Sequence, residues 1–269
     1  MSGDRVAQHV VKRFLGLLAA STLLAACGAE PPAARVTPSP VSTATQAPTP
    51  TPAVATIVQL LDRCPTSAEL ASVNASLSMT FTSDPTAGQL VCTAAEGSRD
   101  LTLLQERAYQ AVLMFTWIRF DAPLPWTDLT LDQWFAKAIH GVAFANDAQD
   151  SYCCLPGGVI AIQSKNLAVL STTLAPWDSV RWLAALYVHE ARHNEGYTHT
   201  CTTGDRAGVN DNTVAELGAW GVEYYFTLWL GTHSDPRVVP EELRPAVRAE
   251  ATSFLPRFFC KEPATSPTP

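Results

Sequence analysis

Two histidines separated by three residues are the strongest chemical signal in this sequence. Residues 189–199 read HEARHNEGYTH, so His193 lies four positions after His189, and Glu190 follows the first histidine directly. On a helix the two histidines lie one turn apart on the same face, and both imidazoles can point at one metal ion. The Glu190 carboxylate can then reach a water molecule at the ion and take its proton. The pattern predicts metal-assisted hydrolysis.

The same stretch has the form HExxHxxGxxH and resembles the signature of the zincins, and within them of the metzincin clan of zinc endopeptidases. The resemblance covers these eleven residues. It implies an α+β, zincin-like fold, in which a central buried metal-binding helix packs on other helices with a small sheet. It also implies Zn²⁺ as the cofactor and a peptide or protein substrate, with Glu190 as the general base of peptide-bond hydrolysis.

One part of the metzincin pattern is missing from this chain. Metzincins carry a methionine turn beneath the metal, downstream of the third histidine, whereas the methionines here are Met1, Met79 and Met114. Either another residue forms that support, or the third ligand comes from elsewhere and the chain is a different branch of zincin.

The third metal ligand has more than one candidate. His199 reaches the ion if the chain leaves the helix sharply after His193, and Gly196 can take the left-handed conformation that ends a helix. Glu216 is the alternative, because a glutamate in an apolar helix needs a partner and a glutamate from a following helix is the third ligand in the gluzincin branch. Glu216 could instead orient a ligand histidine from behind. Asp205, Asp211 and Cys201 are further candidates.

Two further features of the site stay open at this level. In the mechanism that the resemblance implies, a phenol often helps to hold the oxyanion, and Tyr197, Tyr224 and Tyr225 are candidates. The rival to an enzyme is a surface lipoprotein with a structural zinc site, which would need a fourth protein ligand such as Cys201 or Glu216.

The N-terminus predicts export and lipid attachment. Lys12 and Arg13 precede an apolar run over residues 14–26, which ends in the sequence LAAC at Cys27. A basic start, a short apolar core and small residues are typical of a secretory signal rather than a membrane span. The ending resembles a bacterial lipobox, which implies cleavage before Cys27, a lipid on its thiol, and anchoring at the cell membrane or the outer membrane.

Composition divides the rest of the chain. Residues 27–56 are mostly Ala, Pro, Thr, Ser and Val and predict an extended linker, while residues 261–269 predict a disordered tail. Residues 57–260 are long enough for one domain with a substantial core. The formal charge is −7, and loss of residues 1–26, with three basic residues and one acidic residue, makes it −9. Nucleic acid is therefore not expected as a partner.

Six cysteines remain after Cys27, which suggests up to three disulfides in an exported domain. Cys64 and Cys92 are the local pair. Cys153 and Cys154 are expected to reach two different partners, because a ring across one peptide bond is strained. A disulfide at Cys201 would hold the third ligand in place.

Sequence periodicity predicts the remaining elements. Helices are expected over residues 66–77, from residue 101 to about 118, over 130–139, 178–195 with Asp178 as N-cap, 213–230 and 240–259, the last as scaffold. Thr66 with Glu69 and Thr130 with Gln133 would cap the first and third of these. Both faces of the 178–195 helix are apolar, so it is expected to be buried. Glu216 and Glu223 share one face of the apolar 213–230 helix and need partners there. Residues 78–82 and 89–93 predict a hairpin, and residues 158–163 and 167–171 predict two further strands. By resemblance to zincins, residues 159–162 would form the edge that binds an extended substrate. The alternative is an interior strand with no exposed edge.

Overall fold

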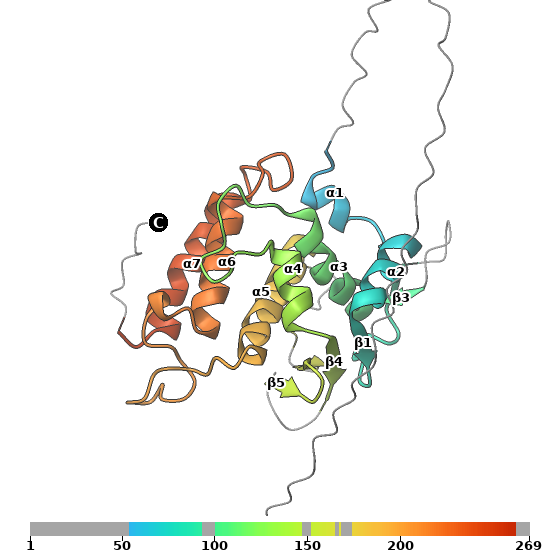
Figure 1. The fold of residues 1–269 in the computed structure, drawn as a ribbon. Helices are drawn as coiled ribbons and strands as arrows, with labels where there is room; N and C mark the ends of the chain where they lie inside the picture. Colours follow the sequence, from blue (N-terminus) through green and yellow to red (C-terminus); the bar gives the residue numbers. More distant parts are fainter. Residues whose placement is uncertain (1–53, 93–99, 147–151, 165–166, 168–173, 262–269) are drawn as a thin grey trace, which may run out of the picture. The chain divides into compact units, whose positions relative to one another are not determined.

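A computed structural model describes residues 54–92, 100–146, 152–164, 167 and 174–261 (Figure 1). The chain forms a mixed α+β fold, which confirms the α+β part of the predicted class. The helices are α1 (Ile57–Leu61), α2 (Ser67–Ser76), α3 (Leu103–Trp117), α4 (Leu131–Ala138), α5 (Pro176–Asn194), α6 (Ala219–Thr232) and α7 (Arg244–Phe258). The strands are β1 (Ser78–Phe81), β2 (Leu90–Cys92), β3 (Leu101–Thr102), β4 (Gly141–Ala145), β5 (Tyr152–Leu155) and β6 (Val159–Gln163).

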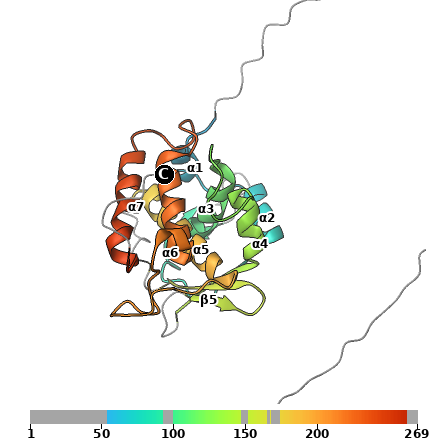
Figure 2. The ribbon, with the colours of Figure 1, turned by 60° about the vertical axis from the view of Figure 1, so that its left-hand side comes forward.

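Helix α5 is the centre of the fold. It packs on α3 and α4 on one side and on α6 on the other, while α7 lies against α6 (Figures 1 and 2). One face of α5 is fully buried in the main core and consists of Val180, Leu183, Tyr187 and Ala191. A helix buried in this way has little freedom to move, so the histidines on it are held in fixed positions.

The predicted hairpin is wrong, because its two halves belong to different sheets. β1 pairs in parallel with β4, in a four-stranded sheet with the order β1-β4-β6-β5. β2 pairs with β3 in a separate two-stranded sheet. Tertiary pairing with a distant strand has replaced the local turn at residues 84–88.

The predicted substrate edge at residues 159–162 is also wrong. β6 lies inside the sheet, parallel to β4 and antiparallel to β5, so both of its edges are occupied. β5 forms the edge strand on this side. The proposed second strand at 167–171 lies largely outside the described residues, and Leu167 itself is not in a strand.

Capping residues start two of the helices as expected. The Thr66 hydroxyl accepts from the Glu69 backbone N–H at 3.2 Å, and the Glu69 carboxylate accepts from the Thr66 backbone N–H at 2.8 Å. At the start of α4 the Gln133 side-chain oxygen accepts from the Thr130 backbone N–H at 3.2 Å. Helix α5, in contrast, begins at Pro176 after Ala175, so Asp178 is in the first turn and is not the N-cap. Proline suits that first position because it has no N–H to leave unpaired.

The helix predicted over 213–230 is broken in two. Residues Val214–Glu216 form a 3₁₀ turn, Leu217 takes a left-handed conformation (φ 51°), and α6 starts afresh at Ala219. The buried side chain of Asp211 causes the restart, because its Oδ2 accepts from the backbone N–H groups of Trp220 (2.9 Å) and Gly221 (3.3 Å).

Three disulfides hold the chain together, and one of them corrects the prediction. Cys64–Cys92 forms as expected, and Cys201 pairs with Cys260, which ties the segment after His199 to the end of α7. Cys153 and Cys154 pair with each other across a cis peptide bond, with Cα atoms 3.1 Å apart, and not with two separate partners.

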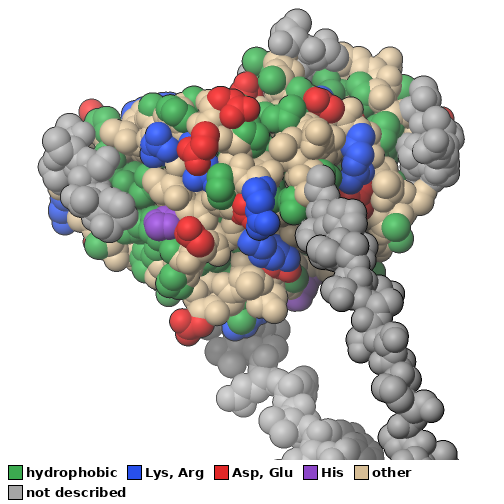
Figure 3. All heavy atoms as spheres, turned by 90° about the horizontal axis from the view of Figure 1, so that it is seen from above, with side chains coloured by type: hydrophobic (Ala, Val, Ile, Leu, Met, Phe, Trp, Pro, Cys, Tyr) green, Lys and Arg blue, Asp and Glu red, His purple; other side chains and the backbone are tan. Residues whose placement is uncertain are grey.

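Several predictions fall on residues that the structure does not describe. These are the signal segment, Cys27, the linker up to residue 53 and the tail from residue 262. Among the described helices, none combines the length and the apolar character needed to cross a membrane. On the face seen in Figure 3, basic and acidic side chains of the described residues are interspersed.

Gly218 offers a test of the α6 start. A Cβ at this position would lie 2.5 Å from Oδ2 of Asp211 and would push that carboxylate off the helix it caps. We expect Gly218→Ala to lower the free energy of unfolding in urea by about 1–3 kcal/mol. Gly88→Ala is the control, because a Cβ there meets no atom within 4 Å, and its effect should stay below about 0.5 kcal/mol. Equal effects in the two variants would contradict this account of the helix start.

Candidate metal centre

The three histidines of the sequence motif converge in the structure. One ring nitrogen from each of His189, His193 and His199 lies within 4.8 Å of those of the other two. Their ring centroids are 4.9 Å (His189 to His193), 5.4 Å (His189 to His199) and 4.7 Å (His193 to His199) apart. Such a group could hold a metal ion.

A sharp turn brings the third histidine back to the helix that carries the first two. Helix α5 ends at Asn194, and Gly196 has φ +93°, a conformation that residues with a Cβ rarely adopt. Arg192 secures the turn: its guanidinium lies 3.3 Å from the ring centroid of Tyr197 and donates to the carbonyl of Leu217 at 2.8 Å. The predicted role of Gly196 is therefore confirmed.

Each histidine uses Nδ1 to bond an oxygen atom behind it. The partners are the Glu223 carboxylate for His189 (2.9 Å), the Tyr197 carbonyl for His193 (2.6 Å) and the Asp211 carboxylate for His199 (3.1 Å). A carbonyl oxygen only accepts, so Nδ1 of His193 carries the proton, and ionised carboxylates at Glu223 and Asp211 favour the same tautomer in His189 and His199. This leaves the three Nε2 lone pairs for a metal, an arrangement that suits borderline divalent cations such as zinc. Burial raises the pKa of Glu223, and a cation bound by His189 would lower it again.

The alternative ligands take other positions. Glu216 lies on the 3₁₀ turn, exposed, where its carboxylate bonds Thr200 and Asn212, so it braces the loop that carries His199 and is not part of the metal group. Asp211 supports His199 from behind, and Cys201 is in a disulfide. Asp205 is in an exposed turn and also lies outside the group.

The orienting role that the sequence suggested for Glu216 belongs to Glu223. The sequence marked Glu223 as one of several glutamates on an apolar helix. Helix α6 places it 7% exposed, where it bonds His189. Glu223 was identifiable only as a buried charge in need of a partner, and the partner itself comes from the packing of α6 on α5.

Trp220 supplies apolar support for two of the ligands. Its ring centroid lies 4.3 Å from that of His189 and 6.1 Å from that of His199, and the ring also stacks on Phe258 at 3.7 Å. The indole Nε1 donates to the Val209 carbonyl at 2.8 Å, which holds the ring in place. This side chain packs against two of the three imidazoles.

The tyrosines proposed for the oxyanion do not line the cleft beside the histidines. Tyr197 is exposed under Arg192, Tyr224 is buried in a small core cluster with Phe259, and Tyr225 packs on Trp229. The cleft has a volume of about 650 Å³ and is lined in part by His189, Glu190 and His199.

Burial changes the proton affinity of the site. Desolvation, together with the nearby His199, lowers the pKa of His189 to about 3, and desolvation with His189 lowers that of His193 to about 4. Both rings are thus neutral at pH 7, as metal ligands must be. Desolvation and the nearby Glu223 raise the pKa of Glu190 to about 8, while a hydrogen bond from the Cys153 backbone lowers it. A carboxyl that titrates near neutral pH can both take and release a proton.

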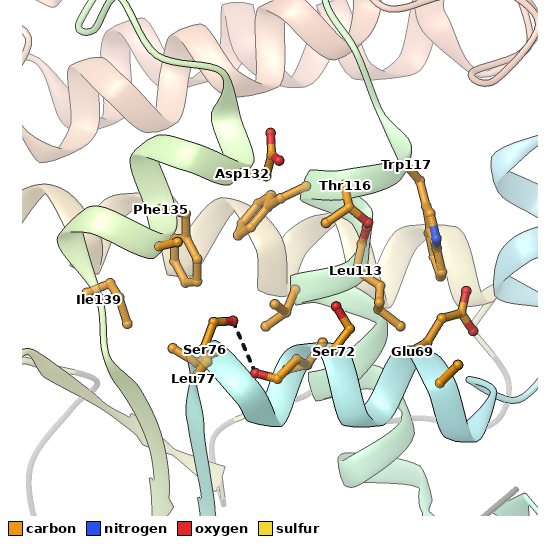
Figure 4. Close-up of a pocket in the computed structure, with 15 residues that line it drawn as sticks. Glu69, Ser72, Ser76, Leu77, Leu113, Thr116, Trp117, Asp132, Phe135 and Ile139 are labelled. Atoms are coloured by element: carbon orange, nitrogen blue, oxygen red, sulfur yellow. Dashed lines mark hydrogen bonds between the residues drawn. The ribbon is translucent and has the colours of Figure 1, made fainter. Parts of the chain in front are cut away.

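A second pocket, of about 460 Å³, lies between α2, α3 and α4 (Figure 4). Its lining is mainly apolar, and neither of its carboxylates is free: Glu69 is paired with Arg63 at 2.6 Å, and Asp132 accepts from Thr130. None of the three histidines lines this pocket. The chemistry of the described residues is therefore concentrated in the cleft beside His189.

Cys64, Cys92 and Glu106 also lie close together, but the two cysteines are in a disulfide and cannot bind a metal.

Comparison with known proteins adds no relative. The chain matches no family model, and it has no significant match among curated proteins or solved structures.

The choice of third ligand can be tested by metal retention. We expect His199→Ala to weaken zinc binding at least about 100-fold, because one of three donors is lost, and Glu216→Ala to weaken it less than about tenfold. Competition with a chromophoric chelator measures both affinities. A larger loss in the Glu216 variant would overturn the assignment of His199.

The raised pKa of Glu190 predicts a dependence of stability on pH in the metal-free protein. Between about pH 4.5 and pH 8 the folded state keeps a proton that the unfolded state has lost, so the stability of the wild type falls as pH rises through this window. Glutamine does not titrate. Glu190→Gln should therefore gain stability relative to wild type between about pH 5 and pH 8, at about 1.4 kcal/mol per pKa unit at most. Urea unfolding of both proteins at about pH 5 and pH 8 measures the difference in their free energies of unfolding. A difference that is the same at the two pH values would disprove the raised pKa of Glu190.

Proposed function

We propose that this protein is a lipid-anchored, extracytoplasmic zinc-dependent peptidase with a zincin-type fold. The observation that carries the proposal is the convergence of three histidines, each with Nδ1 engaged, at a cleft that His189, His199 and the buried carboxyl group of Glu190 line. Perturbed titratable groups that meet in a cleft are typical of active sites.

Different residues of the chain would have different roles in hydrolysis. His189, His193 and His199 would hold the zinc, which when bound would supply Lewis-acid activation of the peptide carbonyl and of the attacking water. Glu190 takes a proton from the attacking water and delivers it to the nitrogen of the leaving amine as the C–N bond breaks. Glu223 and Asp211 keep the histidine rings oriented and favour the tautomer that leaves Nε2 free.

The proposed location rests on the N-terminal sequence. A basic start, an apolar run and LAAC at Cys27 suit a lipoprotein signal. Three disulfides in the domain favour an oxidising compartment outside the cytoplasm.

A non-catalytic lipoprotein with a structural zinc site is the second candidate. Structural zinc sites are normally closed by four protein ligands. Among the described residues the metal group holds three, and the two proposed fourth ligands, Cys201 and Glu216, are engaged elsewhere. This count favours the enzyme.

Glu190→Gln separates the two candidates. If the protein is a peptidase, the variant should bind zinc as the wild type does and lose cleavage of a mixed peptide library by about 10²–10⁴-fold, because the proton acceptor is removed and the ligands are kept. Metal analysis and mass spectrometry of the products measure the two quantities. A wild type that binds zinc and cleaves no peptide would favour the structural site.

A further inference from the structure

The cleft beside the histidines extends along α5 between α6 and α7. Trp182 and Leu186 line it from α5, two turns and one turn before His189 respectively, and Phe254 and Phe258 line it from α7. Trp220 completes the wall at the metal end. Helix α7, which the sequence suggested was scaffold, therefore forms part of the site. A cleft of this size with aromatic walls suits a large apolar group of a ligand.

The carboxylates in this cleft already have partners. Glu223 bonds Nδ1 of His189 at 2.9 Å, and Glu250 pairs with Arg181 at 2.6 Å. Glu190 accepts from the Cys153 backbone and faces the proposed reaction centre. Each of the three carboxyl groups is therefore already engaged by a group of the protein through at least one bond.

Arg257 is the charged group of the cleft that has no counterion. It is exposed on the last turn of α7, and its guanidinium forms no ion pair with a carboxylate of the described residues. Its Cζ lies 5.0 Å from the ring centroid of Phe258, which stacks on Trp220, which in turn contacts His189. The cation is thus next to the aromatic wall and within a few side chains of the metal ligands.

We propose that this cleft binds the C-terminal residue of a peptide, so that the protein removes single residues as a carboxypeptidase. An aromatic or large aliphatic side chain would pack between α5 and α7. The terminal carboxylate would bind Arg257, whose planar guanidinium can donate two parallel hydrogen bonds to it. This inference rests on the proposed peptidase function and names its substrate class.

The reaction needs water as the only co-reactant. The water oxygen adds to the last peptide carbonyl carbon, and the C–N bond to the terminal residue breaks. One water proton passes through Glu190 to the leaving nitrogen. The products are a free amino acid and a peptide shortened by one residue.

Ligand binding to the zinc-loaded protein tests the role of Arg257 without relying on catalysis. The probes are N-acetylphenylalanine and its amide, which differ only in the carboxylate, with N-acetylglycine as the probe without a side chain. We expect the wild type to bind the acid at least about tenfold more tightly than the amide, and N-acetylphenylalanine more tightly than N-acetylglycine. Calorimetry measures the affinities.

Matched variants assign the preference to one residue. Arg257→Gln should reduce the ratio of acid to amide affinity about tenfold relative to wild type, whereas Arg257→Lys should keep part of it. Arg237→Gln is the control, because Arg237 is exposed (72%) and outside the cleft, and it should leave the ratio unchanged. Any direct contact of the carboxylate with zinc contributes equally to all of these proteins and cancels in the comparison.

The outcomes separate this inference from the proposed function. Three results would overturn the carboxylate site. The wild type could bind the acid and the amide equally, it could bind neither, or Arg257→Gln could leave the ratio of acid to amide affinity unchanged. Cleavage of internal bonds in C-terminally amidated peptides at the rate seen for free acids would also overturn it and leave the peptidase standing. If the protein shows the expected preference for the acid and cleaves no peptide, the carboxylate site is supported and the proposed peptidase function is wrong.

Discussion

The buried carboxylate of Asp211 couples His199, the third histidine of the candidate metal group, to the rest of the fold. One of its oxygens bonds Nδ1 of His199, and the other caps the first N–H groups of α6. The Asp211 backbone is held as well, since its N–H donates to Phe258 and its carbonyl accepts from Cys260. The Cys201–Cys260 disulfide reinforces the same connection. The loop after α5 therefore cannot move without disturbing α6 or the end of α7.

Contacts of this kind orient all three histidines of the candidate metal group. Each imidazole is oriented by a different part of the structure: α6 for His189, the turn after Gly196 for His193, and the Asp211 loop for His199. Trp220 fills the space against two of the rings. Because the rings are oriented before any metal arrives, little reorganisation accompanies binding. A preorganised site with an accessible cleft is what a hydrolytic metal centre requires.

The two faces of α5 have different tasks. The face with Val180 and Leu183 is buried in the core and holds the helix still, while the face with Trp182, Leu186 and His189 lines the cleft. Both faces are apolar in the sequence, so hydrophobicity alone suggested that both were core. Helix α7 was misread for the same reason, because its Phe254 and Phe258 form a wall of the cleft as well as contacts with neighbouring helices.

Local rules were enough for the metal helix, the histidine triad and the turn at Gly196, because the spacing of residues within a helix and the conformational freedom of glycine act over a few residues. The capping pairs at Thr66 and Thr130 were predictable for the same reason. Only the tertiary structure decided which strands pair, where α6 starts, and that Glu223 rather than Glu216 stands behind His189. It also decided the pairing of Cys153 with Cys154. Those outcomes depend on contacts between residues far apart in the chain, and neither periodicity nor composition specifies which distant partner a buried charge or an unpaired strand will meet.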